Sequence, residues 1–221
     1  MDIGNIVTAV IINYQTPDLT QQAVATFRKF YPDLQLILID NGSGDESANI
    51  LTDIRNSQPA TTKLVINKTN IHHGPAMHDA INLCSTDLVL FIDSDCEVLR
   101  GGFVEAMIEL IEQDMQNYAI GKLEILNKRG FLVKPNQTGI RYIRPICMMI
   151  RKSLYSILPP FQLHGAPCLA NMKIAAVRNF CLIDFDIHKF IFHKGRGTAS
   201  KFGYGLGIGG KVNYILNKLN L

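Results

Sequence analysis

The chain has 221 residues, 47% of them hydrophobic and 19% charged, and its formal net charge is +3 at pH 7. This length is sufficient for one domain with a sizeable core, and the composition excludes an intrinsically disordered chain. The 22 Lys and Arg residues are scattered without a long basic run, so we expect no nucleic-acid partner.

The cysteines and the N-terminus bear on the cellular compartment. The five cysteines are odd in number and include no Cys-x-x-Cys pair, which is typical of reduced thiols and not of a disulfide framework or a zinc site. An acid, Asp2, and no basic residue precedes the first apolar run, so we interpret that run as a strand and not as a signal peptide. No apolar run approaches the ~20 residues needed to span a bilayer. We therefore expect a cytoplasmic protein.

Runs rich in Val, Ile and Leu alternate with helical patterns in the first half of the chain. They predict strands over 6–13, 34–40, 63–67 and 88–93, with helices over about 17–31, up to 55, 74–84 and 102–115. Continuous apolar strands separated by helices indicate an α/β fold with a mostly parallel central sheet and helices on both faces.

Polar residues follow each of these four strands. They stand at 13–14, 40–41, 67–70 and 93–95. Loop caps would explain any one of these groups, but they explain less well four groups at one edge of a sheet. Because a parallel sheet binds its ligand outside the carboxyl ends of its strands, we expect the functional site at this edge.

The pattern becomes less regular after the fourth helix. It predicts strands over 118–126 and 130–134 around a turn, a buried strand entering a helix over 144–154, a helix near 168–179, a strand-like piece over 181–193, a Gly-rich segment over 203–211 and a short amphipathic helix over 212–221.

The fourth strand, in "LVLFIDSDCEV" (88–98), ends in two aspartates one residue apart, Asp93 and Asp95. Residues i and i+2 of an extended segment project to the same side, so the two carboxylates can converge on one point. Two anions held that close repel, and a divalent cation relieves the repulsion. Carboxylate oxygens suit Mg²⁺ or Mn²⁺, which share their coordination shells with phosphates. The pair therefore suggests a nucleotide-phosphate site, although a strand-end cap would also explain it.

A phosphatase of the haloacid-dehalogenase type is a rival interpretation of the same pair. There an Asp-x-Asp motif also follows an apolar strand, and the first aspartate is a nucleophile. That motif has Thr or Val where this chain has Glu97, and it lies on the first strand and not on the fourth. Both differences disfavour the phosphatase.

Four motifs in chain order resemble family 2 glycosyltransferases of the GT-A fold. They are an apolar strand with a polar turn ("VTAVIINY"), a strand ending "DNGSGD", an Asn- and Gly-containing segment before a helix, and the "FIDSD" strand end. The resemblance covers residues 6–100 well and 101–200 loosely. It implies a single GT-A-like domain over 1–200, with a nucleotide-sugar-binding half over 1–100 and an acceptor half over 101–200, followed by the tail 201–221. It also implies a Mn²⁺ or Mg²⁺ cofactor and transfer of a sugar, with inversion, from a nucleoside-diphosphate sugar.

The resemblance implies donor contacts for residues at the first two strand ends. Asn13 and Tyr14 match the first loop, which flanks the nucleotide base. Asp40, followed by Asn41, matches the acid that accepts hydrogen bonds from the base. A turn cap for the segment after the second strand is an alternative role for Asp40. The family usually has an Asn where this chain has His78, which puts contacts from the third helix in doubt.

The resemblance also implies a metal shell. Asp93 and Asp95 match the pair that contacts the metal and the ribose, and His193 in "FHKGRGT" resembles a late histidine that completes the shell. Arg196, in the same segment, is placed to clamp a diphosphate. An ordinary strand-end histidine and a solvated loop arginine are the alternatives.

The catalytic base is the least determined part of the prediction. Inverting transfer needs a group that accepts the proton of the acceptor hydroxyl, and many relatives place an acidic pair where this chain reads "FQLHGAP". The candidates are His164 in this segment and Asp184 or Asp186 in "LIDFDIH". Without a base, the chain would be an inactive nucleotide-sugar-binding module, and this alternative stays open.

The acceptor and the assembly follow from weaker signals. We expect an unspecified glycan or lipid-linked acceptor. For the helix over 212–221 we favour packing on the chain's own core or on a partner subunit, as in a homodimer. Contact with the inner face of a membrane that carries a lipid-linked acceptor is the alternative, which would make the protein peripheral to that membrane.

Overall fold

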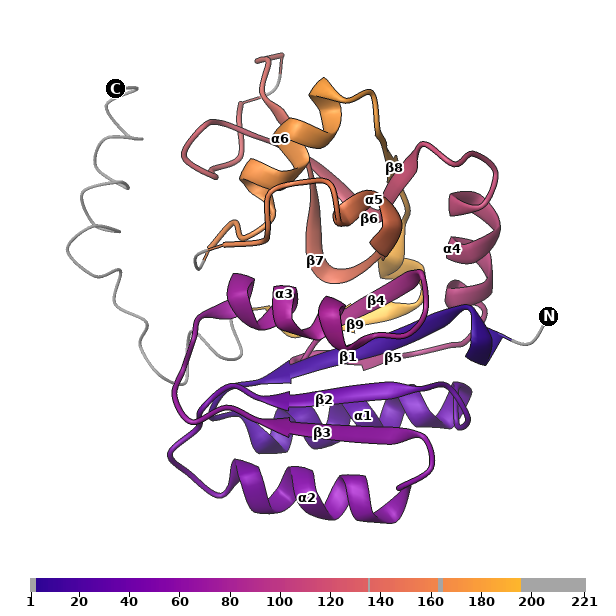
Figure 1. The fold of residues 1–221 in the computed structure, drawn as a ribbon, viewed down its shortest axis with the longest axis vertical. Helices are drawn as coiled ribbons and strands as arrows, with labels where there is room; N and C mark the ends of the chain where they lie inside the picture. The colour runs from indigo at the N-terminus through magenta and orange to yellow at the C-terminus, as the bar shows by residue number, and fades with distance from the viewer. Residues whose placement is uncertain (1–2, 135, 163–164, 196–221) are drawn as a thin grey trace.

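The computed structural model describes residues 3–134, 136–162 and 165–195. Its main sheet has seven strands in the order β3-β2-β1-β4-β7-β6-β8, and a second sheet pairs β5 with β9 (Figure 1). The strands are β1 (Val7–Asn13), β2 (Leu36–Asp40), β3 (Thr62–Ile66), β4 (Leu88–Asp93), β5 (Cys96–Val98), β6 (Asn117–Leu126), β7 (Ile140–Arg151), β8 (Cys181–Asp184) and β9 (Ile191–His193). The helices are η1 (Ile3–Asn5), α1 (Pro17–Phe30), α2 (Ser47–Ser57), α3 (His73–Leu83), α4 (Phe103–Ile111), α5 (Lys152–Tyr155), α6 (Leu169–Val177) and η2 (Ile187–Lys189).

The predicted strand–helix alternation of the first half is confirmed. Strands β1, β2, β3 and β4 are parallel, and β7 joins β4 antiparallel. Each of β1 and β2 is buried along its whole length, as expected for central strands that are covered on both faces.

Two hydrophobic clusters cover the two faces of the sheet. One contains buried residues of α1, α2 and α4, and the other contains buried residues of α3 and α6 together with Tyr155 of α5. Pro17 starts α1 at a position where its missing N–H costs nothing, and Ala23, Val24 and Phe27 turn one helix face into the first cluster. Both clusters include side chains of β1, β2, β4 and β7, so the strands that carry the polar edge are held between packed layers.

The less regular second half differs from the prediction in three places. Helix α4 ends at Ile111 and not near 115, because the Asp114 side chain accepts the Gln116 N–H and forms a turn. The segment 130–134 makes a single bridge, between Leu126 and Leu132, since the Asn127 side chain folds the chain after β6. The strand-like piece over 181–193 is divided into β8, η2 and β9, which connect the two sheets.

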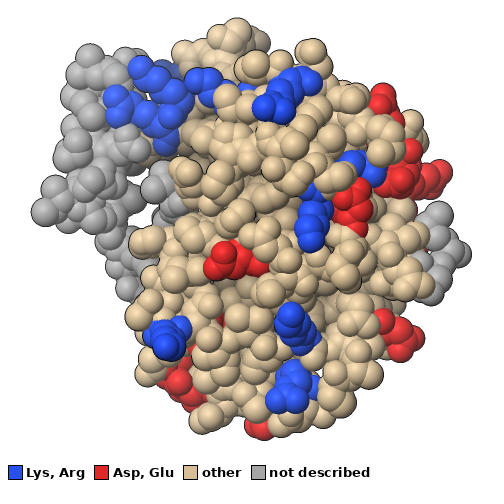
Figure 2. Space-filling view, in the orientation of Figure 1, with Lys and Arg blue, Asp and Glu red and all other residues tan. Residues whose placement is uncertain are grey.

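Charged side chains are dispersed over the face shown in Figure 2, where Lys and Arg occur at several separate places with acids between them. Within the described ranges, no helix combines the length and the apolar character that crossing a bilayer requires.

Candidate functional site

The carboxyl ends of the parallel strands meet at one edge of the sheet, as predicted. Asn13 pairs with Asp40 and Ile12 pairs with Asp93 in the strand registers. Strand β1 lies between β2 on one side and β4 on the other, so the chain order reverses here. Such a switch point leaves a crevice outside the strand ends, where α/β sheets bind ligands.

Asp93, Asp95 and His193 form a compact cluster at this edge. Each offers one ligand atom, and the three atoms lie within 4.8 Å of one another. The predicted convergence of the two aspartates is confirmed. It results from a tight turn between β4 and β5, whereas the prediction assumed that the strand continues in an extended conformation. Asp95 is 7% exposed, so its carboxylate is held in a fixed direction.

The small β5–β9 sheet carries His193 to the aspartates from almost a hundred residues away. Cys96 pairs with His193 across this sheet, and the Lys194 N–H donates to the Asp95 carbonyl oxygen over 3.1 Å. These backbone bonds place the His193 Nε2 at 3.1 Å from Asp95 Oδ1.

The cluster carries unfavourable negative charge when it holds no cation. Burial, and then repulsion by Asp95, raise the pKa of Asp93 to about 7. The hydrogen bond to Asp95 raises the pKa of His193 above its ordinary value. Both groups therefore take up protons easily, which indicates that the site favours added positive charge.

The donor set fits a divalent cation. Two carboxylates and one imidazole are hard or borderline ligands that suit Mg²⁺ or Mn²⁺. The two negative charges of the aspartates would balance the two positive charges of the ion. A metal bound by Asp93, Asp95 and His193 is thus compatible with the residues present.

A second histidine, His73, lies next to the cluster and was not predicted. Its Nε2 is 3.9 Å from Asp93 Oδ1, and it is the first residue of α3. It stands just beyond the polar group that the sequence indicated at the end of the third strand. If the polar group at this strand end were extended through "NIHHG", it would include His73.

Asn13 and Asp40 are in the predicted place but bond mainly to their neighbours. Asn13 is fully buried and its Nδ2 donates to Asp40 Oδ1 over 2.9 Å. Asp40 is 1% exposed and also accepts hydrogen bonds from the Ser43 hydroxyl and the Ser43 N–H. This geometry favours the turn-cap role of Asp40 that the sequence left as an alternative.

Asn41 joins the second and third strand ends. Its Nδ2 donates to Asn70 Oδ1, and its Oδ1 accepts from the Asn67 side chain. Gly42, the next residue, has a φ of +75°, and a Cβ there would lie 2.1 Å from the Thr69 carbonyl carbon, so only glycine fits. Tyr14 is partly exposed beside Asn13 at the same edge.

The two acids proposed as bases, Asp184 and Asp186, do not join the cluster. Strand β8 is three strands from β4, which corresponds to about 14 Å at the usual spacing. Asp184 at its end accepts the Leu123 N–H, and Asp186 forms an ion pair with Lys189. His164, Arg196 and the tail 201–221 lie outside the described residues, so their predicted roles stay predictions.

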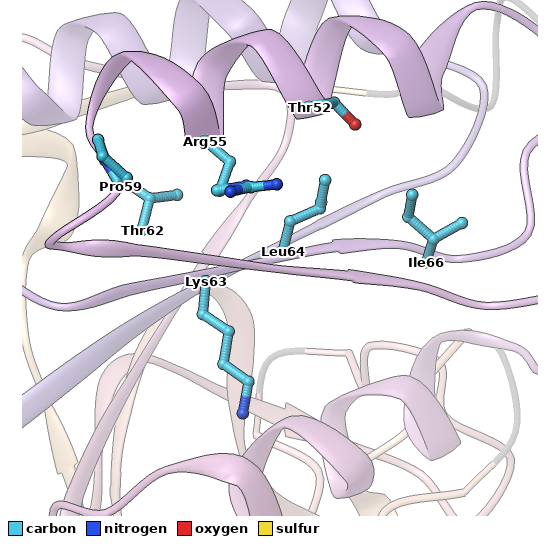
Figure 3. Close-up of a pocket in the computed structure, with 7 residues that line it drawn as sticks. All are labelled: Thr52, Arg55, Pro59, Thr62, Lys63, Leu64 and Ile66. Carbon is cyan, nitrogen blue, oxygen red and sulfur yellow. The ribbon is translucent and has the colours of Figure 1, made fainter.

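Two hollows lie apart from the cluster. One, of about 600 Å³, lies between α2 and the edge strand β3, and in Figure 3 Arg55 and Leu64 lie on the α2 side of β3 while Lys63 points away from it. The other, of about 220 Å³, includes His78, whose Nδ1 is 2.8 Å from the Tyr155 hydroxyl oxygen. His78 thus contacts α5 and not the cluster. Neither lining includes a carboxylate, so neither resembles the metal-type site.

Comparison with known proteins identifies the family. The profile of the family described as "Glycosyl transferase family 2" matches residues 8–171, which is well over half of the chain. The chain belongs to glycosyl transferase family 2. The matched range contains Asp93 and Asp95 but ends before His193.

One curated protein and two solved structures illustrate what this family 2 member is similar to. Over 81 residues the chain is 30% identical to an undecaprenyl-phosphate 4-deoxy-4-formamido-L-arabinose transferase of Pseudomonas fluorescens, covering 37% of this chain and 24% of that protein. The structure is similar to that of a Pyrobaculum calidifontis mannosyltransferase in complex with GDP-Man and Mn²⁺, with a TM-score of 0.65, 12% identity, and coverage of 81% of this chain and 54% of that one. It is also similar to a Mycobacterium tuberculosis glucosyl-3-phosphoglycerate synthase in complex with phosphoglyceric acid, with a TM-score of 0.57, 13% identity, and coverage of 90% and 75%.

These similarities define the fold. The chain has the GT-A fold of its structural relatives, as the sequence resemblance implied. It spans about a quarter of the curated relative and about half of the mannosyltransferase chain.

Proposed function

We propose that the chain is a metal-dependent glycosyltransferase that moves a sugar, with inversion, from a nucleoside-diphosphate sugar to a glycan or lipid-linked acceptor. The observation that carries the proposal is the Asp93–Asp95–His193 cluster, whose ligand atoms lie within 4.8 Å of one another at the switch point of the sheet. Membership of family 2 supports it, as does the solved mannosyltransferase that holds GDP-Man and Mn²⁺.

In this mechanism the protein's residues position the charges. Asp93 and Asp95 would hold the cation, and the backbone bonds between β9 and the chain after β4 place His193 beside them. When bound, Mn²⁺ or Mg²⁺ supplies Lewis-acid stabilisation of the diphosphate as it departs. Because the turn between β4 and β5 connects the two sheets and Asp95 in this turn is buried, we expect the ligands to reorganise little during the reaction.

For the catalytic base we favour His164 over the two acids of the β8 region. Gln162, two positions before it, packs so closely on α3 that a Cβ on Gly74 would lie 2.5 Å from the Gln162 backbone. Gly74 follows His73, which contacts Asp93. The segment that leads to His164 therefore borders the site, whereas Asp184 is three strands from β4.

Variants of two of the three base candidates, His164 and Asp184, test this choice. We expect His164→Asn to lower sugar transfer about 100-fold or more, as expected for loss of a general base, while the affinity for nucleoside diphosphate and Mn²⁺ stays unchanged. Asp184→Asn should keep transfer within a few-fold of the wild type. The measurement is release of nucleoside diphosphate from a panel of donor sugars, with Mn²⁺, Mg²⁺ or a chelator.

Three outcomes of this assay differ in meaning. Metal-dependent release that His164→Asn removes supports the proposal with its base. Equal release by wild type and His164→Asn contradicts the role of His164 and leaves the metal site in place. Metal-dependent binding of donors without turnover in any condition would instead make the chain the nucleotide-sugar-binding module that the sequence left open.

A further inference from the structure

A partly exposed ion pair of the β6–β7 hairpin lies at the sheet edge that carries the metal-type cluster. The pairing of β7 with β4 ends at Cys147 opposite Ile92, but the pairing of β7 with β6 continues through Ile143 opposite Leu123. Arg144, three residues beyond Cys147, therefore stands past the sheet edge at which Asp93 lies. Its Nε donates to Glu124 Oε2 on the neighbouring strand.

The strand segment that carries Arg144 contacts the cluster. The Cys96 thiol donates to the carbonyl oxygen of Ile146, two residues from Arg144, over 3.5 Å, and Cys96 follows Asp95 and pairs with His193. Lys194, the cation next to His193 in the sequence, is paired with Glu97 at 2.7 Å.

The guanidinium of Arg144 has binding capacity left over. Glu124 bonds to its Nε, and within residues 3–134, 136–162 and 165–195 no acceptor bonds to its two terminal amino groups. The Arg144 side chain is 40% exposed, whereas that of Glu124 is 18% exposed. The less exposed Glu124 carboxylate thus bonds to one side of the guanidinium, and the other side, with the two terminal amino groups, is open.

The charge of the proposed ligand requires such a group. The two aspartates and a divalent cation cancel, so the negative charges of a diphosphate, which increase as the sugar leaves, need a further cation. Guanidinium binds phosphate oxygens in a bidentate geometry, with bonds stronger than those of neutral donors.

We propose that Arg144, oriented by Glu124, binds phosphate oxygens of the ligand at the Asp93–Asp95–His193 site. The inference rests on the proposed function. The phosphate has two chemical sources: the diphosphate of the donor, or a phosphate group carried by the acceptor. Structural relatives provide examples of both kinds of phosphate ligand, since one is solved with GDP-Man and another with phosphoglyceric acid.

The test compares Arg144→Gln with Arg141→Gln. Arg141 is on the same strand, but its terminal amino group donates to the Leu182 carbonyl of β8, away from the cluster. Calorimetry measures the affinity for Mn²⁺ alone, and then for UDP and GDP at saturating Mn²⁺. For the donor source we expect Arg144→Gln to weaken diphosphate binding about tenfold to 100-fold with little change in Mn²⁺ affinity, and Arg141→Gln to match the wild type.

The acceptor source has its own arm, in which inorganic phosphate inhibits release of nucleoside diphosphate from the donor. If Arg144 binds acceptor phosphate, Arg144→Gln keeps diphosphate affinity but raises the inhibitory phosphate concentration about tenfold or more. Glu124→Gln tests the positioning role. It should weaken whichever phosphate contact Arg144 makes, to a lesser degree, without changing the melting temperature or Mn²⁺ affinity.

The outcomes separate this inference from the proposed function. If the wild type binds UDP or GDP with Mn²⁺ and Arg144→Gln changes neither diphosphate affinity nor phosphate inhibition, the role of Arg144 is wrong and the proposed function stands. If the wild type binds no nucleoside diphosphate in the presence of Mn²⁺, the proposed function fails and the inference fails with it.

Discussion

Replacing Asp95 with asparagine is expected to lower metal-dependent transfer about 100-fold or more. Asparagine keeps the size of the side chain and an oxygen ligand but removes one of the two negative charges that face the cation. Loss of several kcal/mol of charge stabilisation corresponds to at least two powers of ten in rate. The affinity for Mn²⁺ should fall together with the rate, because the same charge serves both.

Asp53→Asn provides the matched control for this variant. Asp53 is exposed on α2. This helix packs at the β3 end of the parallel strands, and β4, which carries the site, is at the other end. The control should keep both the transfer rate and Mn²⁺ affinity. A thermal melt of each variant shows whether the protein is folded. If Asp95→Asn is folded and retains wild-type Mn²⁺ affinity, Asp95 is not a metal ligand.

The affinity for Mn²⁺ is expected to fall steeply as the pH falls through about 7. Without metal, burial and Asp95 raise the pKa of Asp93 to about 7, and the bond to Asp95 raises the pKa of His193. Below these pKa values both groups hold protons, and a cation must displace the protons before it binds. Affinity should therefore drop about tenfold per pH unit for one displaced proton and about 100-fold for two.

Proton release gives a second measure of this linkage. Calorimetry in buffers of different ionisation enthalpy counts the protons that Mn²⁺ displaces. We expect at least one proton per Mn²⁺ near pH 6.5 and a value approaching zero near pH 9, and His193→Gln should remove the contribution of the imidazole. Mn²⁺ affinity that is constant between pH 6 and pH 8.5, without proton release, would contradict the arrangement of these two ligands.

The metal-type pair could be predicted because its signal is local. Asp93 and Asp95 are separated by one residue at the end of an apolar strand, and their convergence depends only on the next turn. His193 was recognised through the family resemblance. The β5–β9 pairing that brings it to Asp95 involves strands of three residues each, too short to be predicted from periodicity.

The roles of Asn13 and Asp40 were harder to predict because position alone does not show how a polar group is satisfied. Both stand at the expected edge, yet their hydrogen-bonding capacity is largely used by each other and by Ser43. In sequence, a residue that binds a ligand and one that bonds strand ends together look alike. Only the three-dimensional bonding pattern separates these two roles.

Arg144 and Glu124 carry no sequence signal of their pairing. They lie twenty positions apart on two strands whose register shifts between Gly121 and Leu123. That bulge sets which side chains of the hairpin meet. Because β4 stops pairing with β7 before this part of the hairpin, both side chains lie beyond the sheet edge that carries the site. Neither feature follows from composition or alternation, so this part of the site needed the structure.

The most direct test of the central claim is to locate the cation. A crystal grown with Mn²⁺ and a nucleoside diphosphate, measured at a wavelength where manganese scatters anomalously, shows the position of the ion independently of any assay. We predict an anomalous peak bonded to Asp93, Asp95 and His193, with diphosphate oxygens in the same coordination shell. A bound diphosphate with no manganese at these three residues, or manganese at another site, would contradict the claim.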